Sequence, residues 1–232
     1  MNKNEITIPN NFYSKYGKRI LDIGLSFLAI ICLAPLLMLI YILELRFHGK
    51  PAVYFTKRPG KDGKIFELYK FRSMTNEHGK DGYLLPESQR LTKFGYFIRK
   101  TSIDELAGLF NILKGNMSII GPRPLLIEYL PLYNERHAKR HLIKPGLACV
   151  RIMPTDSETW TWREQFENDM WYIEHLSFIT DLKMVLAVFK EAIKGADYRA
   201  NDTRVPFNGK NLDETRKRDE VENTIRYDSI SK

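Results

Sequence analysis

One apolar stretch near the N-terminus limits the possible folds of this chain more than any other feature of its sequence. From Ile20 to Leu43, the sequence ILDIGLSFLAIICLAPLLMLIYIL holds a single charged residue, Asp22, close to its start. Its 24 residues are enough for a helix to span the apolar part of a bilayer. The stretch is too long for a secretory signal, and no small-residue cleavage site follows it. The sequence therefore predicts a membrane helix that the protein retains.

Pro35 and the basic flanks of this stretch bear on whether the helix crosses the membrane. Proline removes one backbone hydrogen bond and kinks a helix. Basic residues favour the cytoplasmic side of a membrane. They occur on both flanks, as Lys15, Lys18 and Arg19 before the stretch and as Arg46, Lys50, Lys57 and Arg58 after it. We therefore expect a re-entrant helix, kinked at Pro35, that enters and leaves by the same face. An ordinary bitopic anchor with a tolerated proline stays open as the alternative.

Charge is distributed unevenly along the 232 residues, which carry a net charge of +8. Residues 1–150 contain 23 lysines and arginines against 12 acidic residues, whereas residues 151–232 contain 13 against 16. The N-terminal part is therefore expected to bind anions. We expect no nucleic-acid partner, because the chain has a membrane segment and no recognised nucleic-acid-binding motif. The two cysteines, Cys32 and Cys149, indicate no disulfide framework, which suits a cytosolic location for the polar part.

The polar part of the chain shows short strand and helix patterns. Strands are expected at residues 52–56 and 65–71, joined as a hairpin by the turn-rich sequence KRPGKDGK, and at 117–121. Residues 76–90 have the composition of a polar loop. Helical patterns cover residues 128–141, 161–175 and 178–194. These patterns predict a mixed α/β fold that is mostly helical.

The chain divides into four parts on these patterns. They are an N-terminal cytosolic segment at 1–19, the membrane helix at 20–43, a folded domain at 44–205 and a polar tail at 206–232. The apolar stripe of the helix at 178–194 is compatible with core packing and with a membrane interface. The same two alternatives hold for the tryptophans Trp160, Trp162 and Trp171.

An acidic pair, Asp104 and Glu105, stands in the otherwise basic stretch RKTSIDELAGLFNILKGNMSIIGPRP. The sequence SIDE is typical of a capping box, in which Ser102 and Glu105 satisfy each other's backbone N–H groups at the start of a helix. Gly115 is placed to end that helix. Asp104 would then only favour the helix dipole. The short motif by itself favours the cap over a catalytic role.

Several cations stand at rigid positions around this pair. Arg58 precedes Pro59, Arg123 lies between two prolines, and Lys144 precedes Pro145. Proline restricts the backbone next to it, which suits an exposed cation to bind phosphate. Each of these cations taken alone is more simply a solvated charge at a surface turn, but three of them near an acidic pair point to phosphate ligands. On the strand YKFRSM, the alternation of side chains places Lys70 and Arg72 on one face.

These motifs, in this order and spacing, resemble those of the monotopic phosphoglycosyl transferases, the bacterial sugar transferase family. The resemblance rests on the proline-broken apolar helix, RPG, YKFRSM, SIDELAGLFNILKGNMSIIGPRPLLIEYLPLYN and KPG, and it extends from Lys18 to Leu147, more weakly to Lys194. It implies a small α/β catalytic domain at 44–205, carried on a re-entrant membrane helix with amphipathic interfacial helices.

The resemblance also implies an activity. Members of this family transfer a sugar-1-phosphate from a nucleotide diphosphate sugar, usually a UDP-sugar, to undecaprenyl phosphate, and they release UMP and use Mg²⁺. This is the first membrane step of glycoconjugate assembly, at the cytoplasmic face of the bacterial inner membrane. Homo-oligomerisation stays open. The alternative is a membrane-anchored, non-catalytic homologue that binds nucleotide or polyprenyl ligands.

The family's catalytic Asp-Glu pair falls on Asp104 and Glu105. The resemblance implies that Asp104 attacks the β-phosphorus, forms a covalent phosphosugar intermediate and helps to hold the metal, while Glu105 assists as a nearby acid or base. The substrate-binding cations implied or suggested by position are Lys70, Arg99, Arg123, Arg58 and Arg72. A cationic surround is what a carboxylate needs in order to attack a dianionic diphosphate.

The sequence departs from the family pattern at two places. Ala34 precedes Pro35, where relatives commonly have a serine whose hydroxyl satisfies carbonyls freed by the proline. After KPG the chain reads LACVRIMPTDSETWTW in a part of the family associated with substrate recognition. The sequence therefore leaves open the sugar and the base of the donor.

Overall fold

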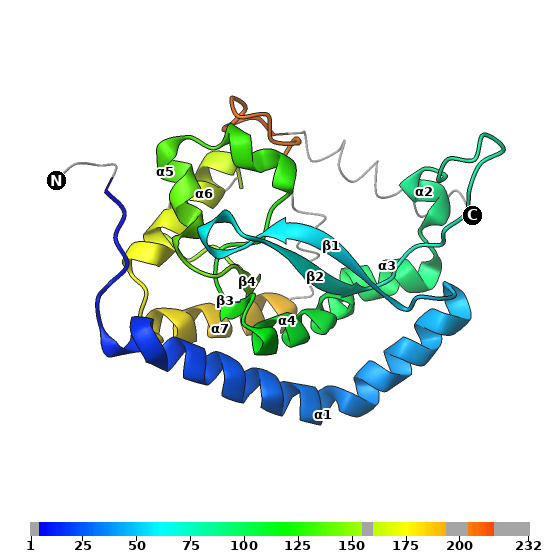
Figure 1. The fold of residues 1–232 in the computed structure, drawn as a ribbon, viewed down its shortest axis with the longest axis horizontal. Helices are drawn as coiled ribbons and strands as arrows, with labels where there is room; N and C mark the ends of the chain where they lie inside the picture. Colours follow the sequence, from blue (N-terminus) through cyan, green and yellow to red (C-terminus); the bar gives the residue numbers. More distant parts are fainter. Residues whose placement is uncertain (1–4, 155–159, 194–203, 216–232) are drawn as a thin grey trace.

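A long helix defines one side of the molecule in the computed structural model, which describes residues 5–154, 160–193 and 204–215 (Figure 1). A π-helical turn, Tyr13–Gly17, leads directly into α1, Lys18–Phe47, which has 30 residues and contains Pro35. Figure 1 shows that α1 bends near its middle and that the other labelled elements lie on one side of it. The predicted helix at 20–43 is thus present and extends further at both ends.

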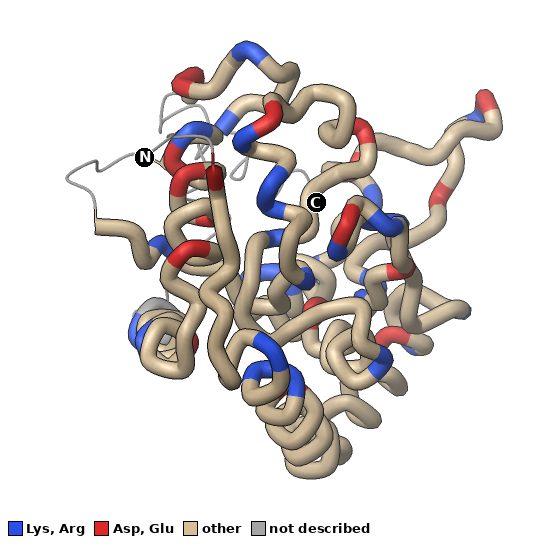
Figure 2. Tube along the Cα trace, turned by 60° about the vertical axis from the view of Figure 1, so that its left-hand side comes forward, with Lys and Arg blue, Asp and Glu red and all other residues tan. Residues whose placement is uncertain are grey.

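The surface of α1 is largely apolar and exposed. The helical stretch Tyr13–Phe47 is long and apolar enough to cross a membrane, and only 11% of its most apolar window is buried in the protein. Figure 2 shows basic positions at the start of this helix and almost no charge along the middle of it. A helix that exposes so much apolar surface is expected to contact lipid.

One face of α1 attaches to the rest of the protein through apolar and polar contacts. Leu37 and Ile40 are buried against Phe71 and Ile98. Asp22 is also buried, and its carboxylate accepts hydrogen bonds from the Ser118 hydroxyl at 3.0 Å and the Ile119 N–H at 2.9 Å. Together these contacts fix the helix along its length.

The predicted hairpin is confirmed. Strands β1, Val53–Pro59, and β2, Ile65–Phe71, pair antiparallel, with Val53 opposite Phe71 and Pro59 opposite Ile65. A short 3₁₀ turn connects them, and in it Asp62 adopts a left-handed backbone with φ of 57°. The hairpin brings β2 against the segment that carries the acidic pair.

That segment does not begin with the predicted capping box. The residue expected as N-cap, Ser102, has a left-handed backbone with φ of 56° and makes no side-chain cap. Ile103–Gly108 forms a 3₁₀ turn, and only then does α4, Leu109–Lys114, begin. An N-cap needs an extended backbone to aim its side chain at the helix, so the capping prediction is wrong. Gly115, with φ of 89°, ends α4 as expected.

Two short helices precede this turn, within the stretch between β2 and the acidic pair. They are α2, Glu87–Arg90, and α3, Lys93–Lys100. The Thr92 side chain caps α3 by accepting from the Gly95 N–H. Helix α3 was not predicted, because its eight residues are too few to show a clear apolar period.

A second, two-stranded sheet contacts α4 through its strand β3. Strand β3, Ser118–Ile120, was predicted, and it pairs parallel with β4, Gly146–Ala148, which was not. The backbones approach closely beside this pair, since a Cβ on Gly146 would lie 2.1 Å from the Gly121 nitrogen. Between the strands, the predicted helix at 128–141 is broken into Ile127–Leu132, α5 at Glu135–Ala138, and Lys139–Leu142. Pro131 lies in the first of these pieces, where a regular α-helix is disfavoured.

Two longer helices complete the described fold. Helix α6, Trp162–Glu174, starts at a capping box between Thr161 and Glu164 and matches its prediction. Helix α7, Phe178–Ile193, also matches, and it packs through Met184, which is 1% exposed. Its outer face stays apolar and exposed, with five residues between 46% and 63% accessible: Phe178, Ile179, Leu182, Leu186 and Phe189. The fold is thus a mixture of helices with two small sheets.

The first residues of the predicted polar tail pack on the domain. Phe207 is 4% exposed and joins a cluster with Tyr129, Trp162 and Phe166. Asn211 is 3% exposed. Trp162 therefore fills a core, while residues 216–232 lie outside the described part of the chain.

Candidate active site

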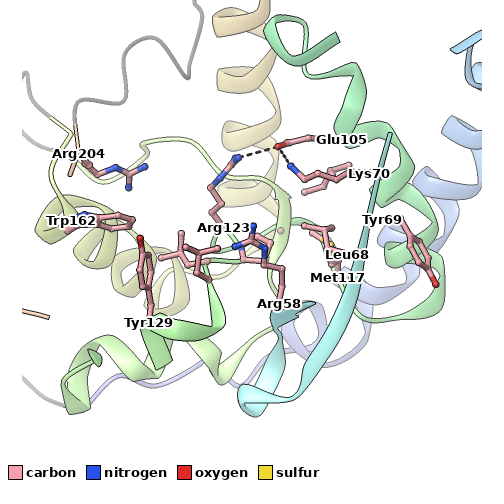
Figure 3. A pocket seen from close by; sticks show the side chains of 15 residues that line it. Arg58, Leu68, Tyr69, Lys70, Glu105, Met117, Arg123, Tyr129, Trp162 and Arg204 are labelled. Atoms are coloured by element: carbon pink, nitrogen blue, oxygen red, sulfur yellow. Dashed lines mark hydrogen bonds and ion pairs between the residues drawn. The ribbon is translucent and has the colours of Figure 1, made fainter. Parts of the chain in front are cut away.

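A pocket of about 240 Å³ lies where β2, the turn at 103–108 and the loop after β3 meet (Figure 3). It is lined at one end by Lys70, Glu105 and Arg123, with Arg58 close by on β1. The pocket therefore brings together four of the residues that the sequence pointed to.

Glu105 is the centre of the charged end of the pocket. Its Oε1 accepts a hydrogen bond from Lys70 Nζ at 2.9 Å and from Arg123 Nη2 at 3.1 Å. The three side chains are 17%, 16% and 30% exposed, for Glu105, Lys70 and Arg123 respectively. These ion pairs are therefore less screened than pairs on an open surface.

The cations outnumber the carboxylate on the pocket wall, and burial acts on their pKa values. Burial lowers the pKa of Lys70, and the charges of Glu105 and Asp104 oppose that change. Burial also lowers the pKa of Arg58, as does the nearby Arg123 charge. This wall is thus suited to bind an anion, which would form ion pairs with the cations that Glu105 does not fully neutralise.

Asp104 precedes Glu105 on the same 3₁₀ turn and is 3% exposed. Its negative charge is close enough to Lys70 to oppose the lowering of that lysine's pKa by burial. Asp104 does not line the pocket, whereas the next residue, Glu105, does. A buried carboxylate beside several cations has the surroundings that a nucleophile for a phosphate needs.

Arg123 is fixed from behind by a buried ion pair. Arg140 Nη2 donates to the Arg123 carbonyl at 2.8 Å and also contacts Asp169 Oδ2 at 2.8 Å. The Arg140 and Asp169 side chains are each 1% exposed. Gln165 completes the arrangement by donating to Asp169 Oδ1 at 3.0 Å. The backbone of the proline-flanked arginine is therefore held by the core and not by the turn alone.

Two predicted phosphate ligands do not line this pocket. Arg72 is buried, and its guanidinium donates to the carbonyls of His48 at 3.1 Å and Lys50 at 3.3 Å. The strand ends at Phe71, so the alternation that paired Arg72 with Lys70 does not reach it. Arg99 Nε donates to the Ser73 hydroxyl at 2.7 Å.

The opposite end of the pocket is aromatic. Arg204 lies over the ring of Trp162 at 4.3 Å, and Tyr129 packs edge-on against the same ring. The sequence analysis assigned no ligand to these residues. Trp162 stood among tryptophans with two open interpretations, and Arg204 reaches the pocket from a distant segment that no local pattern connects to it.

A divalent cation is compatible with part of this site. Among the described residues there is no group of three or more His, Cys, Asp or Glu side chains arranged to hold a metal. Mg²⁺ is usually bound through one or two carboxylates together with substrate phosphates and water. Asp104 and Glu105 fit that limited requirement, with the other ligands coming from a substrate.

Comparison with known proteins places these observations in a family. Residues 13–195 match the family described as bacterial sugar transferase. An uncharacterised sugar transferase of Bacillus subtilis is 42% identical over 177 residues, which are 76% of this chain and 87% of that protein.

Two relatives carry names that state an activity. The undecaprenyl-phosphate galactose phosphotransferase of Salmonella typhimurium is 32% identical over 82% of this chain. The UDP-glucose:undecaprenyl-phosphate glucose-1-phosphate transferase of Klebsiella pneumoniae is 35% identical over the same share. The chain spans 44% and 43% of these two proteins, less than half of their length. Its own match to the family covers most of its length, so the chain is a transferase that belongs to the bacterial sugar transferase family.

Proposed function

We propose that this protein transfers a sugar-1-phosphate from a nucleotide diphosphate sugar, most simply a UDP-sugar, to undecaprenyl phosphate. The observation that carries the proposal is the bridging of Glu105 by Lys70 and Arg123 beside the buried Asp104. The names of the relatives from Salmonella typhimurium and Klebsiella pneumoniae support the same acceptor. The donor named for the Klebsiella pneumoniae relative supports a uridine nucleotide.

The reaction proceeds in two displacements at one phosphorus atom. A carboxylate oxygen of Asp104 forms a bond to the β-phosphorus, and the bond from that phosphorus to the bridging oxygen breaks, so that UMP leaves with the oxygen. A phosphate oxygen of undecaprenyl phosphate then bonds to the same phosphorus, and the Asp104 carboxylate is released. A covalent intermediate of this kind divides one difficult transfer into two easier ones.

The cations of the pocket serve the first displacement. Before the donor binds, Glu105 holds Lys70 and Arg123 in place. The diphosphate then forms ion pairs with both cations, and Arg58 on β1 adds its positive charge. Fixed cations aimed at a site of developing charge stabilise the transition state without reorganisation. Arg72 and Arg99 receive no phosphate-binding role, because they do not line the pocket.

Mg²⁺ would be held by Asp104, with Glu105 within reach, and by the diphosphate of the donor. When bound it supplies a Lewis acid that neutralises charge on the phosphate oxygens. Lys70 and Arg123 would orient the same phosphate. At the aromatic end of the pocket, the planar guanidinium of Arg204, supported by the buried Trp162 ring beneath it, offers a flat surface to the base of the nucleotide.

Membrane attachment brings the two substrates together. We assign α1 to a re-entrant position in the bacterial inner membrane, with the catalytic domain at the cytoplasmic face, where nucleotide sugars occur. The start of α7 lies beside the start of α1, since Tyr13 and Lys18 both contact Asp181 of α7, and Tyr13 also packs edge-on against Phe178 of the apolar exposed face. Two such surfaces on one side of the domain suit contact with a single membrane leaflet.

A panel of nucleotide sugars tests the proposal. The detergent-solubilised protein is incubated with undecaprenyl phosphate, Mg²⁺ and one donor at a time, and UMP release is measured. We expect release with at least one UDP-sugar and none from the Asp104→Asn variant. A panel without release, in a preparation that still binds a UDP-sugar, would support the non-catalytic homologue instead.

A further inference from the structure

A second pocket, of about 280 Å³, lies at the start of α1 and shares no lining residue with the active-site pocket. Five basic side chains line it, against one carboxylate: Lys15, Lys18, Arg19, Lys61 and Lys144, with Asp22. Figure 2 shows the basic positions that gather at the start of the long helix. The sequence analysis singled out Lys144 as a cation on a rigid turn, and the proposed reaction gives it no role.

The carboxylate and two of the cations already have partners within the protein. Asp22 accepts hydrogen bonds from Ser118 and Ile119. Lys18 Nζ lies 2.6 Å from Asp181 Oδ2. Arg19 donates to the carbonyls of Ile112 at 2.6 Å and Leu113 at 2.9 Å, at the end of α4. The side chains of these three residues are therefore already bound within the protein.

The other three cations have no such partner. Lys15, Lys61 and Lys144 form no ion pair with any residue in the described part of the chain. Burial lowers the pKa of Lys144, and the neighbouring charges of Arg19 and Lys61 lower it further, while the charge of Asp22 opposes the change. Like charges that converge on one cavity repel each other, and a bound anion removes that repulsion.

The position of the cavity indicates which anion it takes. Helix α1 becomes apolar immediately after Arg19, and Ile20 and Ile23 on its surface are 62% and 43% exposed. The pocket also has apolar walls, to which Ile8 and Leu176 contribute. Cations next to a lipid-facing helix attract acidic lipid headgroups, at about 1 kcal/mol for each lysine or arginine near the membrane surface.

We propose that this pocket binds the phosphate of an anionic phospholipid, with Lys61 and Lys144 as its principal ligands, and so fixes the start of α1 at the membrane surface. The proposal rests on the membrane attachment included in the proposed function, but not on turnover. The turn at 144–146 contributes Lys144 to this pocket and Gly146 to the active-site pocket, so a lipid bound here also steadies a wall of the catalytic site.

Thermal unfolding of the full-length protein in a neutral detergent tests the proposal, with short-chain phosphatidylglycerol, phosphatidylcholine, inorganic phosphate and undecaprenyl phosphate titrated separately. A ligand that binds only the folded state raises its Tm according to its affinity. The test variant is Lys61→Gln with Lys144→Gln. The matched control is Lys80→Gln with Lys93→Gln, which removes the same charge from exposed positions outside this pocket.

We expect phosphatidylglycerol to raise Tm in the wild type and in the control, and to bind about 30-fold more weakly to the test variant, as two lost contacts imply. Lipid-free Tm values show whether each variant folds. If phosphatidylglycerol binds equally weakly to both variants, the proposed site is wrong, because the result would show only a general effect of net charge. Stabilisation by inorganic phosphate equal to that by phosphatidylglycerol, lost in the test variant and kept in the control, would identify a soluble anion. Binding of undecaprenyl phosphate that is tighter than that of phosphatidylglycerol and is weakened only in the test variant would assign the pocket to the acceptor. Either result contradicts the proposal. If the wild type binds phosphatidylglycerol as expected but releases no UMP with any nucleotide sugar, that result would count against the proposed function and not against this lipid site.

Discussion

The buried ion pair behind Arg123 allows a sharp test of how the site is held, through the variant Asp169→Asn. Arg140 contacts Asp169 Oδ2 through Nε at 3.0 Å and through Nη2 at 2.8 Å, with both side chains 1% exposed. The substitution keeps the shape of the side chain and removes its charge. Arg140 is then left as a buried cation without a counter-charge, although it keeps its contacts to the Tyr133 hydroxyl and the Arg123 carbonyl.

The burial of the pair sets the expected magnitude. Removing one partner of a buried ion pair costs about 3–5 kcal/mol, a large part of the free energy of unfolding of a typical domain. For a protein of this size, that loss lowers Tm by about 6–20 °C. Turnover should fall as well, because Asp169 no longer fixes Arg140, which then positions the carbonyl of Arg123 less firmly.

The matched control is Asp213→Asn. Arg163 contacts Asp213 through Nε and Nη2, both at 2.8 Å, but the two side chains are 54% and 63% exposed. A pair so exposed contributes at most about 1 kcal/mol. Thermal unfolding of both variants, followed by tryptophan fluorescence in detergent, gives the comparison. Losses of Tm that are equal in the two variants would refute the argument that burial, and not the ion-pair contact itself, sets the cost.

Three further predictions concern the site and the membrane helix. Arg123→Ala should cost about 2–4 kcal/mol of transition-state stabilisation, measured from kcat/KM, and Arg123→Lys should restore only part of it, because lysine lacks the planar fork; complete rescue would show that charge alone is enough. Since burial lowers the pKa of Lys70, its charge is present below that pKa and lost as the pH rises through it, so activity should fall at a lower pH than for a solvated lysine. Glu105→Gln removes a charge that raises this pKa, and a pH-rate profile should show the fall at a still lower pH. Single cysteines at Asn10 and Lys64, in a background free of the native cysteines, should both resist a membrane-impermeant thiol reagent in intact cells; labelling of the first position alone would mean that α1 crosses the membrane.

The parts of this fold that the sequence predicted correctly are those with a local cause. The β1–β2 hairpin follows from strand propensity around a turn of prolines and glycines. Helices α6 and α7 follow from apolar periodicity over more than three turns. The grouping of Lys70, Glu105 and Arg123 was predicted through the resemblance to a known family, and not through spacing alone.

The remaining features depend on contacts between distant segments. The residues at 102–105 match the capping-box sequence, but the left-handed backbone of Ser102 prevents its side chain from capping the helix. The parallel pairing of β3 with β4 joins segments more than 20 residues apart, which no turn signal connects. Arg204 reaches Trp162 from the far end of the segment predicted at 44–205, and no local pattern connects the two residues. Each of these contacts is set by tertiary packing, which overrides local preference.

A covalent phosphosugar adduct on Asp104 would be direct evidence for the proposed two-displacement reaction. The protein is mixed with its UDP-sugar and Mg²⁺ in the absence of undecaprenyl phosphate, quenched rapidly in acid and measured by intact-mass spectrometry with peptide mapping. We expect a mass increase of one sugar phosphate that maps to Asp104, disappears when the acceptor is added, and is absent from the Asp104→Asn variant. Transfer by the wild type without any such adduct, or turnover by Asp104→Asn close to that of the wild type, would contradict the covalent role of Asp104.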